Sequence, residues 1–258
     1  MIPFSKKWRK TRRQRKKFLK RLTPITQFAP EDVFIVGYPK SGNTWFQDLI
    51  TAVVYGVHPV FAPPALAQAL VPDIHKQPYY RRFSTPMFFK SHFRPRPEYR
   101  RVVYLMRDGR DVLVSLYHYE NAMRRPADLA QWVCNGHPSY GKWHTHINAW
   151  LSNPHGAEMI VIKYEDLKHN AAKELQRFCS FAGVKRDASF LETMVRETEF
   201  EKMQQRELQS GSGMRSFPRD KLFRRRGIVG SYKDEMPPAV LEEFMVDAGD
   251  TLKQFGYA

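Results

Sequence analysis

The chain carries a short polar segment, Pro-Lys-Ser-Gly-Asn-Thr at residues 39–44, between an apolar run and a stretch with helical spacing. A loop that leads from a strand into a helix binds anions, because free backbone N–H groups and the helix dipole both favour them. Gly42 allows close backbone approach, and Lys40 adds a positive charge. We therefore predict a phosphate-binding loop, with a surface turn capped by serine and threonine as the alternative.

This loop differs from the phosphate loop of nucleoside triphosphatases. That loop reads G-x-x-x-x-G-K-[ST], and its serine or threonine binds magnesium. Here Lys40 precedes Gly42 and the loop is shorter. We therefore predict no essential magnesium and no metal site, and we keep a nucleotide kinase or triphosphatase of the same sheet class as an alternative function.

A second basic site is predicted where the apolar run at residues 102–106 ends. Arg107 follows the run directly, and Ser115 lies one turn into a helix that begins near Asp111. Arginine suits bidentate binding of phosphate, and the serine is close enough to share the ligand. A corner built from an arginine–aspartate salt bridge is the alternative.

The segment Phe88–Phe93 contains a candidate general base. Side chains alternate along an extended chain, so Lys90 and His92 lie on the same face. Histidine accepts protons near neutral pH, and a neighbouring lysine can stabilise a transferring anionic group. The chain has 9 histidines, so His92 without its flanking pattern would be a structural residue.

Four segments in sequence order resemble those of the cytosolic-type, PAPS-dependent sulfotransferases. The loop at residues 39–45 resembles the 5′-phosphosulfate loop, and residues 101–115 resemble the 3′-phosphate motif. Residues 197–203 resemble a T-x-F-x-x-M segment, and residues 223–233 resemble R-K-G-x-x-G-D-W-K. The resemblance extends from about Val33 to Lys233. It implies a sulfotransferase that moves a sulfuryl group from 3′-phosphoadenosine 5′-phosphosulfate (PAPS) to an acceptor hydroxyl or amine.

The resemblance also implies roles for individual residues. The 5′-phosphosulfate would be held by Lys40, Ser41, Gly42, Asn43 and Thr44. The 3′-phosphate would be held by Arg107, Ser115, Arg225, Arg226 and Gly227. The adenine would lie between Trp45 and Phe200, with Thr198 and Tyr164 nearby. Residues 90–92 resemble the family's K-T-H segment, so His92 would be the base and Lys90 would stabilise the sulfuryl group. Lys40 would stabilise the bridging oxygen.

Apolar runs and helical spacings alternate along the chain. Strands are expected at residues 33–38, 87–90, 102–106 and 159–163, and helices at 43–57, 111–122, 143–151, 171–182 and 188–197. This alternation predicts an α/β fold with a single domain and a central parallel β-sheet flanked by helices, P-loop-like and of the sulfotransferase type. Long loops are expected at residues 59–78, 86–97 and 210–226.

The charge divides the chain into a basic N-terminal arm, residues 1–30, and a sulfotransferase domain, residues 31–258. The net charge is +16, and 11 lysines and arginines lie between Lys6 and Arg21, so the rest carries +5. Residues 6–22 could form a helix. Two interpretations of the arm stay open: adhesion to an anionic membrane surface or nucleic acid, and a solvated basic tail. A non-enzymatic module that binds anionic surfaces through this arm is a further alternative.

The partners and location follow from weaker signals. We expect a small-molecule, lipid or glycan acceptor, and no specific nucleic acid. Contact of residues 1–24 with an anionic membrane stays open. The two cysteines show no disulfide or zinc spacing, and no apolar segment follows the basic start, so a cytoplasmic location is expected, with peripheral membrane contact as an option. The acceptor pocket is expected from residues 61–82, 117–146 and 204–222, which are rich in aromatic residues.

Overall fold

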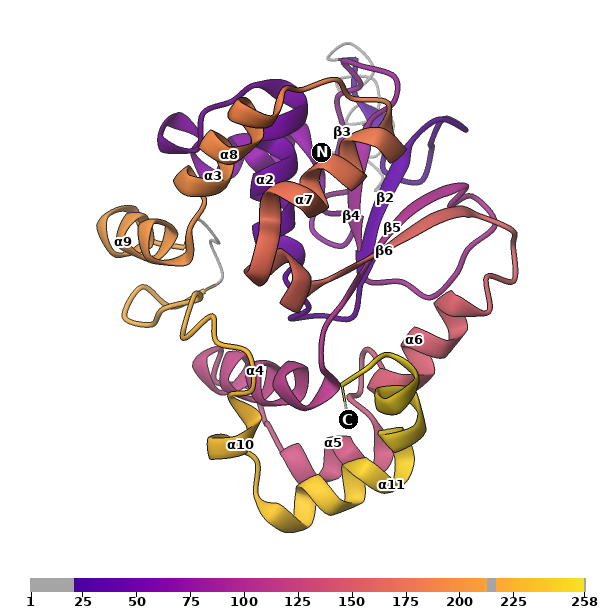
Figure 1. Cartoon of the computed structure of the whole chain (residues 1–258), viewed down its shortest axis with the longest axis vertical. Coiled ribbons are helices and arrows are strands. Elements are labelled where there is room, and N and C mark those ends of the chain that lie inside the picture. The colour runs from indigo at the N-terminus through magenta and orange to yellow at the C-terminus, as the bar shows by residue number, and fades with distance from the viewer. Residues whose placement is uncertain (1–20, 213–216, 258) are drawn as a thin grey trace, which may run out of the picture.

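The central sheet has four parallel strands in the order β4-β2-β5-β6. A computed structural model describes residues 21–212 and 217–257 (Figure 1). The strands of this sheet are β2 (Val33–Gly37), β4 (Phe88–Ser91), β5 (Arg101–Met106) and β6 (Glu158–Lys163). A second, antiparallel pair joins β1 (Thr23–Pro24) to β3 (Tyr79–Tyr80).

Helices connect the strands and continue after the sheet is complete. Those before β6 are α2 (Asn43–Tyr55), the short 3-10 turn η1 (Pro59–Phe61), α3 (Pro64–Leu70), α4 (Gly109–Ala122), α5 (Leu129–Asn135) and α6 (Trp143–Leu151). Those after it are α7 (Tyr164–Ala182), α8 (Ala188–Glu197), α9 (Phe200–Ser210), α10 (Tyr232–Glu235) and α11 (Pro238–Gln254).

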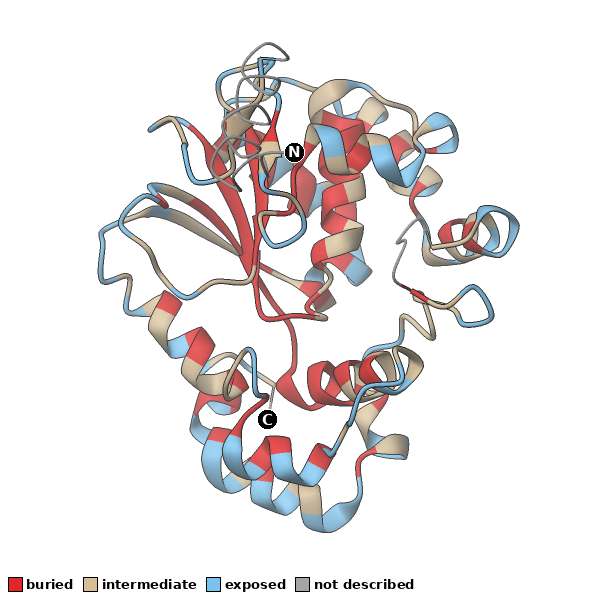
Figure 2. Ribbon diagram, turned by 180° about the vertical axis from the view of Figure 1, so that it is seen from behind, coloured by how far each residue is buried: buried red, intermediate tan, exposed pale blue. Residues whose placement is uncertain are grey.

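Two apolar cores lie on opposite faces of the sheet. Phe34 and Val36 of β2 pack into one core with residues of α4, α5, α6 and α11. Val33 and Ile35 point the other way, into a core with α2, α7 and α8. Strands β2, β4 and β5 are buried on both faces, as Figure 2 shows in red, which is why their sequences are rich in apolar residues, whereas the edge strand β6 is only partly buried. The predicted fold, a parallel sheet flanked by helices, is confirmed.

The predicted elements match the structure except where local sequence lacked a clear pattern. The four predicted strands are present with boundaries shifted by at most one residue. Helix α7 begins at Tyr164, before the predicted start, and is interrupted at Asn170, whose φ is −150°. Helices α3, α5, α9, α10 and α11 and strands β1 and β3 were not predicted, and η1 and α3 lie within the long loop expected at residues 59–78. Helix α11 begins with prolines, which the first turn tolerates, and buries Phe244, Ala248 and Leu252 at a spacing of four residues.

The first described residues pair with β3 and pack against the central sheet. Thr23 and Pro24 pair with β3, and the ring of Phe28 packs edge-on against those of Phe34 and Phe89, with centroids 4.8 and 5.0 Å away. Residues 1–20, which hold most of the predicted arm and its predicted helix, lie outside the described residues. The boundary at residue 30 therefore stays a prediction.

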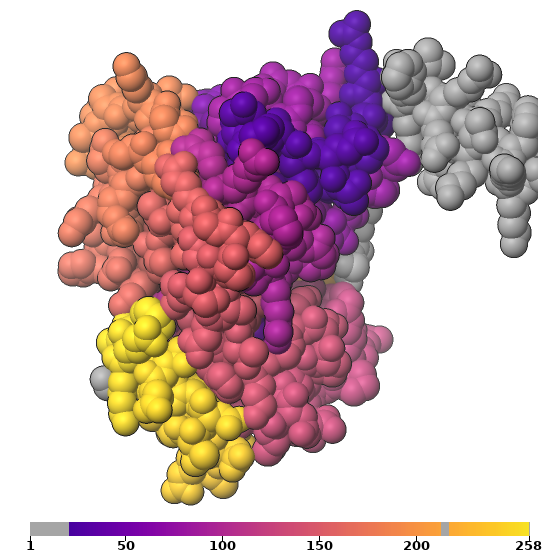
Figure 3. All heavy atoms as spheres, turned by 90° about the vertical axis from the view of Figure 1, so that its right-hand side faces the viewer, coloured from indigo at the N-terminus to yellow at the C-terminus, as the bar shows by residue number. Residues whose placement is uncertain are grey.

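The C-terminal segment closes the layer below the sheet. Helix α11 packs against α5 and α6, and Figure 3 shows this yellow segment beside the pink one. The last described residue, Tyr257, donates its hydroxyl to Glu165 at 2.9 Å, close to the end of β6. In the part of the chain that the structure describes, none of the helices has the length and apolar character that crossing a membrane requires.

The parallel arrangement brings the predicted site residues to one edge. The carboxyl ends of parallel strands meet at the same side of a sheet, which is where α/β proteins bind ligands. Strand β2 leads into the loop at residues 38–42, β4 into His92, β5 into Arg107 and β6 into Tyr164. Segments that are distant in sequence therefore converge above this edge.

Candidate active site

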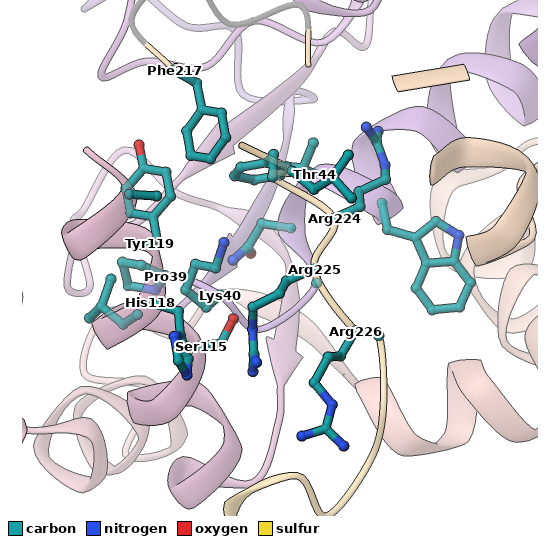
Figure 4. A pocket seen from close by; sticks show the side chains of 18 of the residues that line it. Pro39, Lys40, Thr44, Ser115, His118, Tyr119, Phe217, Arg224, Arg225 and Arg226 are labelled. Atoms are coloured by element: carbon teal, nitrogen blue, oxygen red, sulfur yellow. The ribbon is translucent and has the colours of Figure 1, made fainter. Parts of the chain in front are cut away.

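A pocket of about 750 Å³ opens at the carboxyl edge of the sheet. Most of the predicted site residues line it: Lys40, Gly42, Asn43, Thr44, Trp45, Lys90, His92, Arg107, Ser115, Tyr164, Phe200, Arg225, Arg226 and Gly227. Ser41 and Thr198 are buried just outside this lining. Figure 4 shows Lys40, Ser115 and Arg225 directed into the same space.

The loop between β2 and α2 adopts an unusual backbone that glycine makes possible. Gly42 has φ +92°, and a Cβ there would lie 2.8 Å from the ring of Tyr164. Lys40 also has a positive φ, 73°, which is uncommon outside glycine. The side-chain amide of Asn43 donates to the carbonyl of Tyr38 at 3.0 Å and holds the loop closed. The loop therefore presents the N-terminus of α2 to the pocket.

Three buried polar atoms at this loop have no hydrogen-bond partner among the described residues. Two of them can donate, the hydroxyl of Ser41 and the Nε of Arg107, and the third is the acceptor oxygen Oδ1 of Asn43. A buried polar group without a partner is costly, so each marks a place where a ligand or water supplies the missing bond. Together with the α2 N-terminus, the two donors fit an anion such as a phosphate or sulfate group.

Lys40 lies between aromatic rings and other cations. Its ammonium is 4.1 Å from the ring centroid of Phe223 and 4.7 Å from that of Tyr119. Burial lowers the pKa of Lys40 to about 7, and the positive charges of Arg107 and Lys90 add to the effect. The site therefore holds a cation that an incoming anion would stabilise.

Lys90 is fixed by two partners on different elements. Its ammonium lies 3.3 Å from the carboxylate of Asp73 and donates to the hydroxyl of Thr44 at 3.2 Å. Burial alone would raise the pKa of Asp73. The charge of Lys90, together with other cations, outweighs this effect and lowers the pKa to about 2. Asp73 is therefore ionised and keeps Lys90 beside the loop, although no pattern in the sequence marked Asp73 as a site residue.

His92 is oriented by the backbone of β2. Its Nδ1 lies 2.8 Å from the carbonyl of Gly37, and because a carbonyl only accepts, Nδ1 carries the proton and Nε2 keeps a lone pair. Burial lowers the pKa of His92 to about 3, with a further contribution from Lys90. The ring is therefore neutral at physiological pH and able to accept a proton.

Three residues outside the predicted set hold His92 in place. His75 accepts the backbone N–H of His92 at 2.9 Å, and its ring stacks on that of His92. From α6, His146 Nε2 donates to the carbonyl of His92 at 3.2 Å, and the indole of Trp150 donates to the carbonyl of Phe93 at 2.9 Å. No pattern in the sequence connects His146 and Trp150 with the end of β4, because more than fifty residues separate them from it.

Asp111 joins the first helix of the predicted 3′-phosphate site to the C-terminal loop. It is fully buried and accepts bonds from Gly230 N–H (2.8 Å), Tyr232 N–H (3.0 Å) and the Ser231 hydroxyl (3.1 Å). Arg107 lies 3.5 Å from the same carboxylate. Ser231 and Tyr232, which stand where the R-K-G-x-x-G-D-W-K segment has aspartate and tryptophan, therefore still form a defined loop end.

Arg107 also connects the two loops directly. One Nη donates to the carbonyl of Lys40 at 3.2 Å, and the other donates to the carbonyl of Ile228 at 3.1 Å. Its guanidinium stacks over the ring of Tyr164, with 4.3 Å to the centroid. Several of its donors are thus occupied within the protein, while Nε remains available.

Arg225 and Arg226 converge on a carboxylate. Both bind Glu235, with N···O distances of 2.8 and 2.7 Å, and His118 lies 2.6 Å from the same group. Partial burial raises the pKa of Glu235, but hydrogen bonds from Arg225 and Arg226 outweigh it and lower that pKa to about 2. The sequence did not single out Glu235 or His118 as site residues.

The predicted adenine site is built from aromatic rings on different helices. Trp45 donates its indole N–H to the carbonyl of Thr198 at 3.0 Å and contacts Tyr164 edge-on. Phe200 lies so close to Gly227 that a Cβ there would be 2.4 Å from the ring. The Thr198 hydroxyl donates to the carbonyl of Met194 at 2.8 Å, so Thr198 meets Trp45 through its backbone.

Only some of the aromatic residues in the expected acceptor segments line the pocket. Tyr119, Tyr140 and Phe217 do, whereas Tyr80, Trp132 and Trp143 are buried in the core. The rings of Tyr119 and Phe217 contact Phe223, which follows the last expected segment directly, and the Lys40 ammonium lies over Tyr119 and Phe223. Across residues 21–212 and 217–257, no group of three histidine, cysteine or acidic side chains is placed to hold a metal ion.

Curated relatives of the chain share its length and arrangement. Sulfotransferase 2A1 of Macaca fascicularis is 27% identical over 232 residues, covering 83% of this chain and 81% of the relative. Sulfotransferase 1A1 of Rattus norvegicus is 25% identical over 255 residues, covering 89% and 88%.

Solved structures show the same fold. Mouse sulfotransferase SULT7A1, complexed with PAP, superimposes with a TM-score of 0.65 at 21% identity, covering 90% of this chain and 91% of that one. Retinol dehydratase, in complex with androsterone and the inactive cofactor PAP, has a TM-score of 0.67 at 18% identity, covering 88% and 82%.

The family model for the sulfotransferase domain matches residues 30–256, which is nearly the whole chain. It agrees with the fold, with the relatives and with the resemblance seen in the four sequence segments. The chain therefore belongs to the sulfotransferase domain family and is a sulfotransferase enzyme.

Proposed function

We propose that the chain transfers a sulfuryl group from PAPS to an acceptor hydroxyl or amine, with His92 as general base. The observation that carries this proposal is that His92 lines the same pocket as the loop at Lys40 and a cluster of arginines. The pocket therefore combines groups that suit two phosphates with a neutral imidazole.

The donor end is supported by the charge and the unsatisfied polar groups. Lys40, the N-terminus of α2 and the hydroxyl of Ser41 suit the 5′-phosphosulfate. Ser115, Arg107, Arg225, Arg226 and Gly227 suit the 3′-phosphate, because arginine forms paired hydrogen bonds to phosphate. Trp45 and Phe200 line the pocket from α2 and α9, where they suit an adenine ring.

The proposed chemistry is an in-line displacement at sulfur. The acceptor oxygen or nitrogen forms a bond to sulfur, while the bond between sulfur and the bridging oxygen of the donor breaks. The acceptor proton moves to Nε2 of His92, and the electron pair stays on the 5′-phosphate of the departing nucleotide. Lys40 and Lys90 stabilise the negative charge that develops on the bridging oxygen and the sulfuryl group.

The acceptor remains a small molecule, lipid or glycan in this proposal. Retinol dehydratase has been solved in complex with androsterone and with retinol, which are small hydroxylated molecules. In this chain the acceptor end combines the rings of Tyr119, Tyr140 and Phe217 with polar side chains of His75 and Asp73. A cytoplasmic location and peripheral membrane contact through residues 1–24 stay predictions.

The donor assignment is tested by comparing nucleotides on the intact protein. We expect adenosine 3′,5′-bisphosphate (PAP) to bind much more tightly than adenosine 5′-phosphate, without added magnesium, in isothermal titration calorimetry. Incubation with radiolabelled PAPS and a cell extract should yield a sulfated product detectable by mass spectrometry. Equal affinity for the two nucleotides, or binding only of ATP with magnesium, would contradict the proposal and favour a kinase or triphosphatase.

A further inference from the structure

Glu235 presents a carboxylate to the two arginines that suit the 3′-phosphate. Its Oε1 accepts from Arg225 Nη2 at 2.8 Å and from Arg226 Nη1 at 2.7 Å. Its Oε2 lies 2.8 Å from Arg225 Nη1 and 2.6 Å from Nε2 of His118. Arg225 is therefore bound through both terminal nitrogens, as a phosphate would bind it.

The backbone fixes this carboxylate more firmly than the arginines. Glu235 ends the short helix α10, whose first residue, Tyr232, is held by the buried Asp111. The side chains of Arg225 and Arg226 are each 35% exposed, whereas that of Glu235 is 15% exposed. The long arginine side chains can therefore change partner, while the carboxylate stays beside them.

A phosphate in this part of the pocket needs the same hydrogen-bond donors. The terminal nitrogens of an arginine form paired hydrogen bonds with one anion at a time. A second anion close by is repelled by the first. Glu235 is ionised, because its pKa is about 2. Binding of the 3′-phosphate must then either displace the carboxylate from the arginines or share them with it.

We propose that Glu235 limits the affinity of the pocket for the 3′-phosphate by competing with it for Arg225 and Arg226. This inference rests on the proposed function, because it takes these arginines as the 3′-phosphate site. The competition would weaken the binding of donor and product alike. It would therefore speed the release of PAP, the nucleotide that remains after transfer.

The test is Glu235→Gln, which keeps the shape of the side chain and removes its charge. We expect PAP to bind about tenfold more tightly to this variant than to the natural protein. A charged hydrogen bond of this kind contributes about as much free energy as a tenfold change in affinity, or more. Its release, followed by stopped-flow fluorescence, should slow by a similar factor. The affinity for adenosine 5′-phosphate, which lacks the 3′-phosphate, should change less than about twofold.

Two matched variants separate competition from a general charge effect. Asp234→Asn removes the same charge from the neighbouring residue, which is 71% exposed and lies 3.6 Å from Arg226. It should change PAP affinity less than about twofold, because exposed pairs are weak. Glu235→Asp keeps the charge on a shorter side chain, should tighten PAP binding by a smaller factor, and tests the inference if the glutamine variant unfolds.

The possible outcomes distinguish this inference from the proposed function. If both Glu235 variants bind PAP as weakly as the natural protein or more weakly, Glu235 positions the arginines and the competition is wrong. If Asp234→Asn tightens binding as much as Glu235→Gln, net charge explains the effect and the inference is also wrong. If the natural protein does not prefer PAP over adenosine 5′-phosphate, the donor assignment itself fails.

Discussion

His92 and Lys40 both have lowered pKa values, with opposite consequences for their charge. His92, with a pKa of about 3, is neutral throughout the physiological range and can accept a proton. Lys40, with a pKa of about 7, changes charge within that range. The charge of the proposed base is therefore insensitive to pH near neutrality, whereas the charge of Lys40 in the proposed donor site is not.

Replacement of His92 by alanine separates catalysis from binding. Because a positioned base typically contributes about 100-fold to 10,000-fold, turnover should fall by that factor. PAP affinity, measured by calorimetry, should stay within about twofold, since the imidazole bonds to Gly37 and not to the arginine cluster. His155→Ala, an exposed loop substitution, is the control and should leave both unchanged. An equal loss of turnover and PAP affinity would mean that His92 is structural.

The pKa of Lys40 predicts how donor affinity depends on pH. Between pH 7 and 9 the nucleotide phosphates are fully ionised, so the loss of the Lys40 proton dominates. Since the anion binds the charged form, the dissociation constant of PAP should rise with pH, by at most about tenfold per unit. Lys40→Arg stays charged and should abolish this rise. A dissociation constant that stays flat in the natural protein would contradict the assignment of Lys40.

At the scale of elements, Asp111 connects α4 to the loop that precedes α10. Its two oxygens accept bonds from three donors in residues 230–232 and lie near Arg107. The loop bearing Arg225 and the strand end bearing Arg107 are therefore held by one buried carboxylate. The geometry of the 3′-phosphate site depends on this connection.

Replacement of Asp111 by asparagine should lower the free energy of unfolding and weaken the binding of the 3′-phosphate. Asparagine has a single acceptor oxygen, so at least one buried donor loses its partner, at a cost of about 1–3 kcal/mol in the free energy of unfolding. Urea denaturation measures this cost, and the ratio of PAP to adenosine 5′-phosphate affinities should fall. Asp128→Asn, at the N-cap of α5, is the control, because asparagine caps helices as well as aspartate. An unchanged ratio would show that Asp111 only stabilises the fold.

For the whole molecule, the distribution of charge separates the arm from the domain. Ten of the lysines and arginines lie within residues 1–20, while the arginines and lysines of the pocket come from the domain. The described chain begins at residue 21, and β1 already pairs with β3. Truncation after residue 20 therefore tests whether the basic segment before it contributes to the proposed donor site.

Deletion of residues 1–20 should leave PAP affinity and sulfuryl transfer within about twofold of the natural protein at physiological salt, because surface charges are screened beyond about 8 Å. Calorimetry and the transfer assay measure this. If the arm adheres to membranes, only the full chain should sediment with vesicles that contain phosphatidylserine. Loss of all nucleotide binding on truncation would favour the alternative of a module that binds anions through its arm.

The sequence by itself determined the sheet and the residues at its carboxyl edge. Buried parallel strands are local apolar runs, so their positions could be predicted, and Lys40, His92 and Arg107 follow those runs directly. The resemblance of four segments indicated the family and the transfer chemistry, and the family is confirmed.

Only the tertiary structure decided which side chains meet these residues. The residues that contact the site come from distant helices and loops. They are Asp73, His146, Phe223 and Glu235, which meet Lys90, His92, Lys40 and Arg225 in turn. Local spacing carries no signal of such contacts, because chain folding and not sequence proximity brings them together. The lowered pKa of Lys40, whose ammonium lies beside aromatic rings, therefore depends on packing that the sequence pattern does not contain.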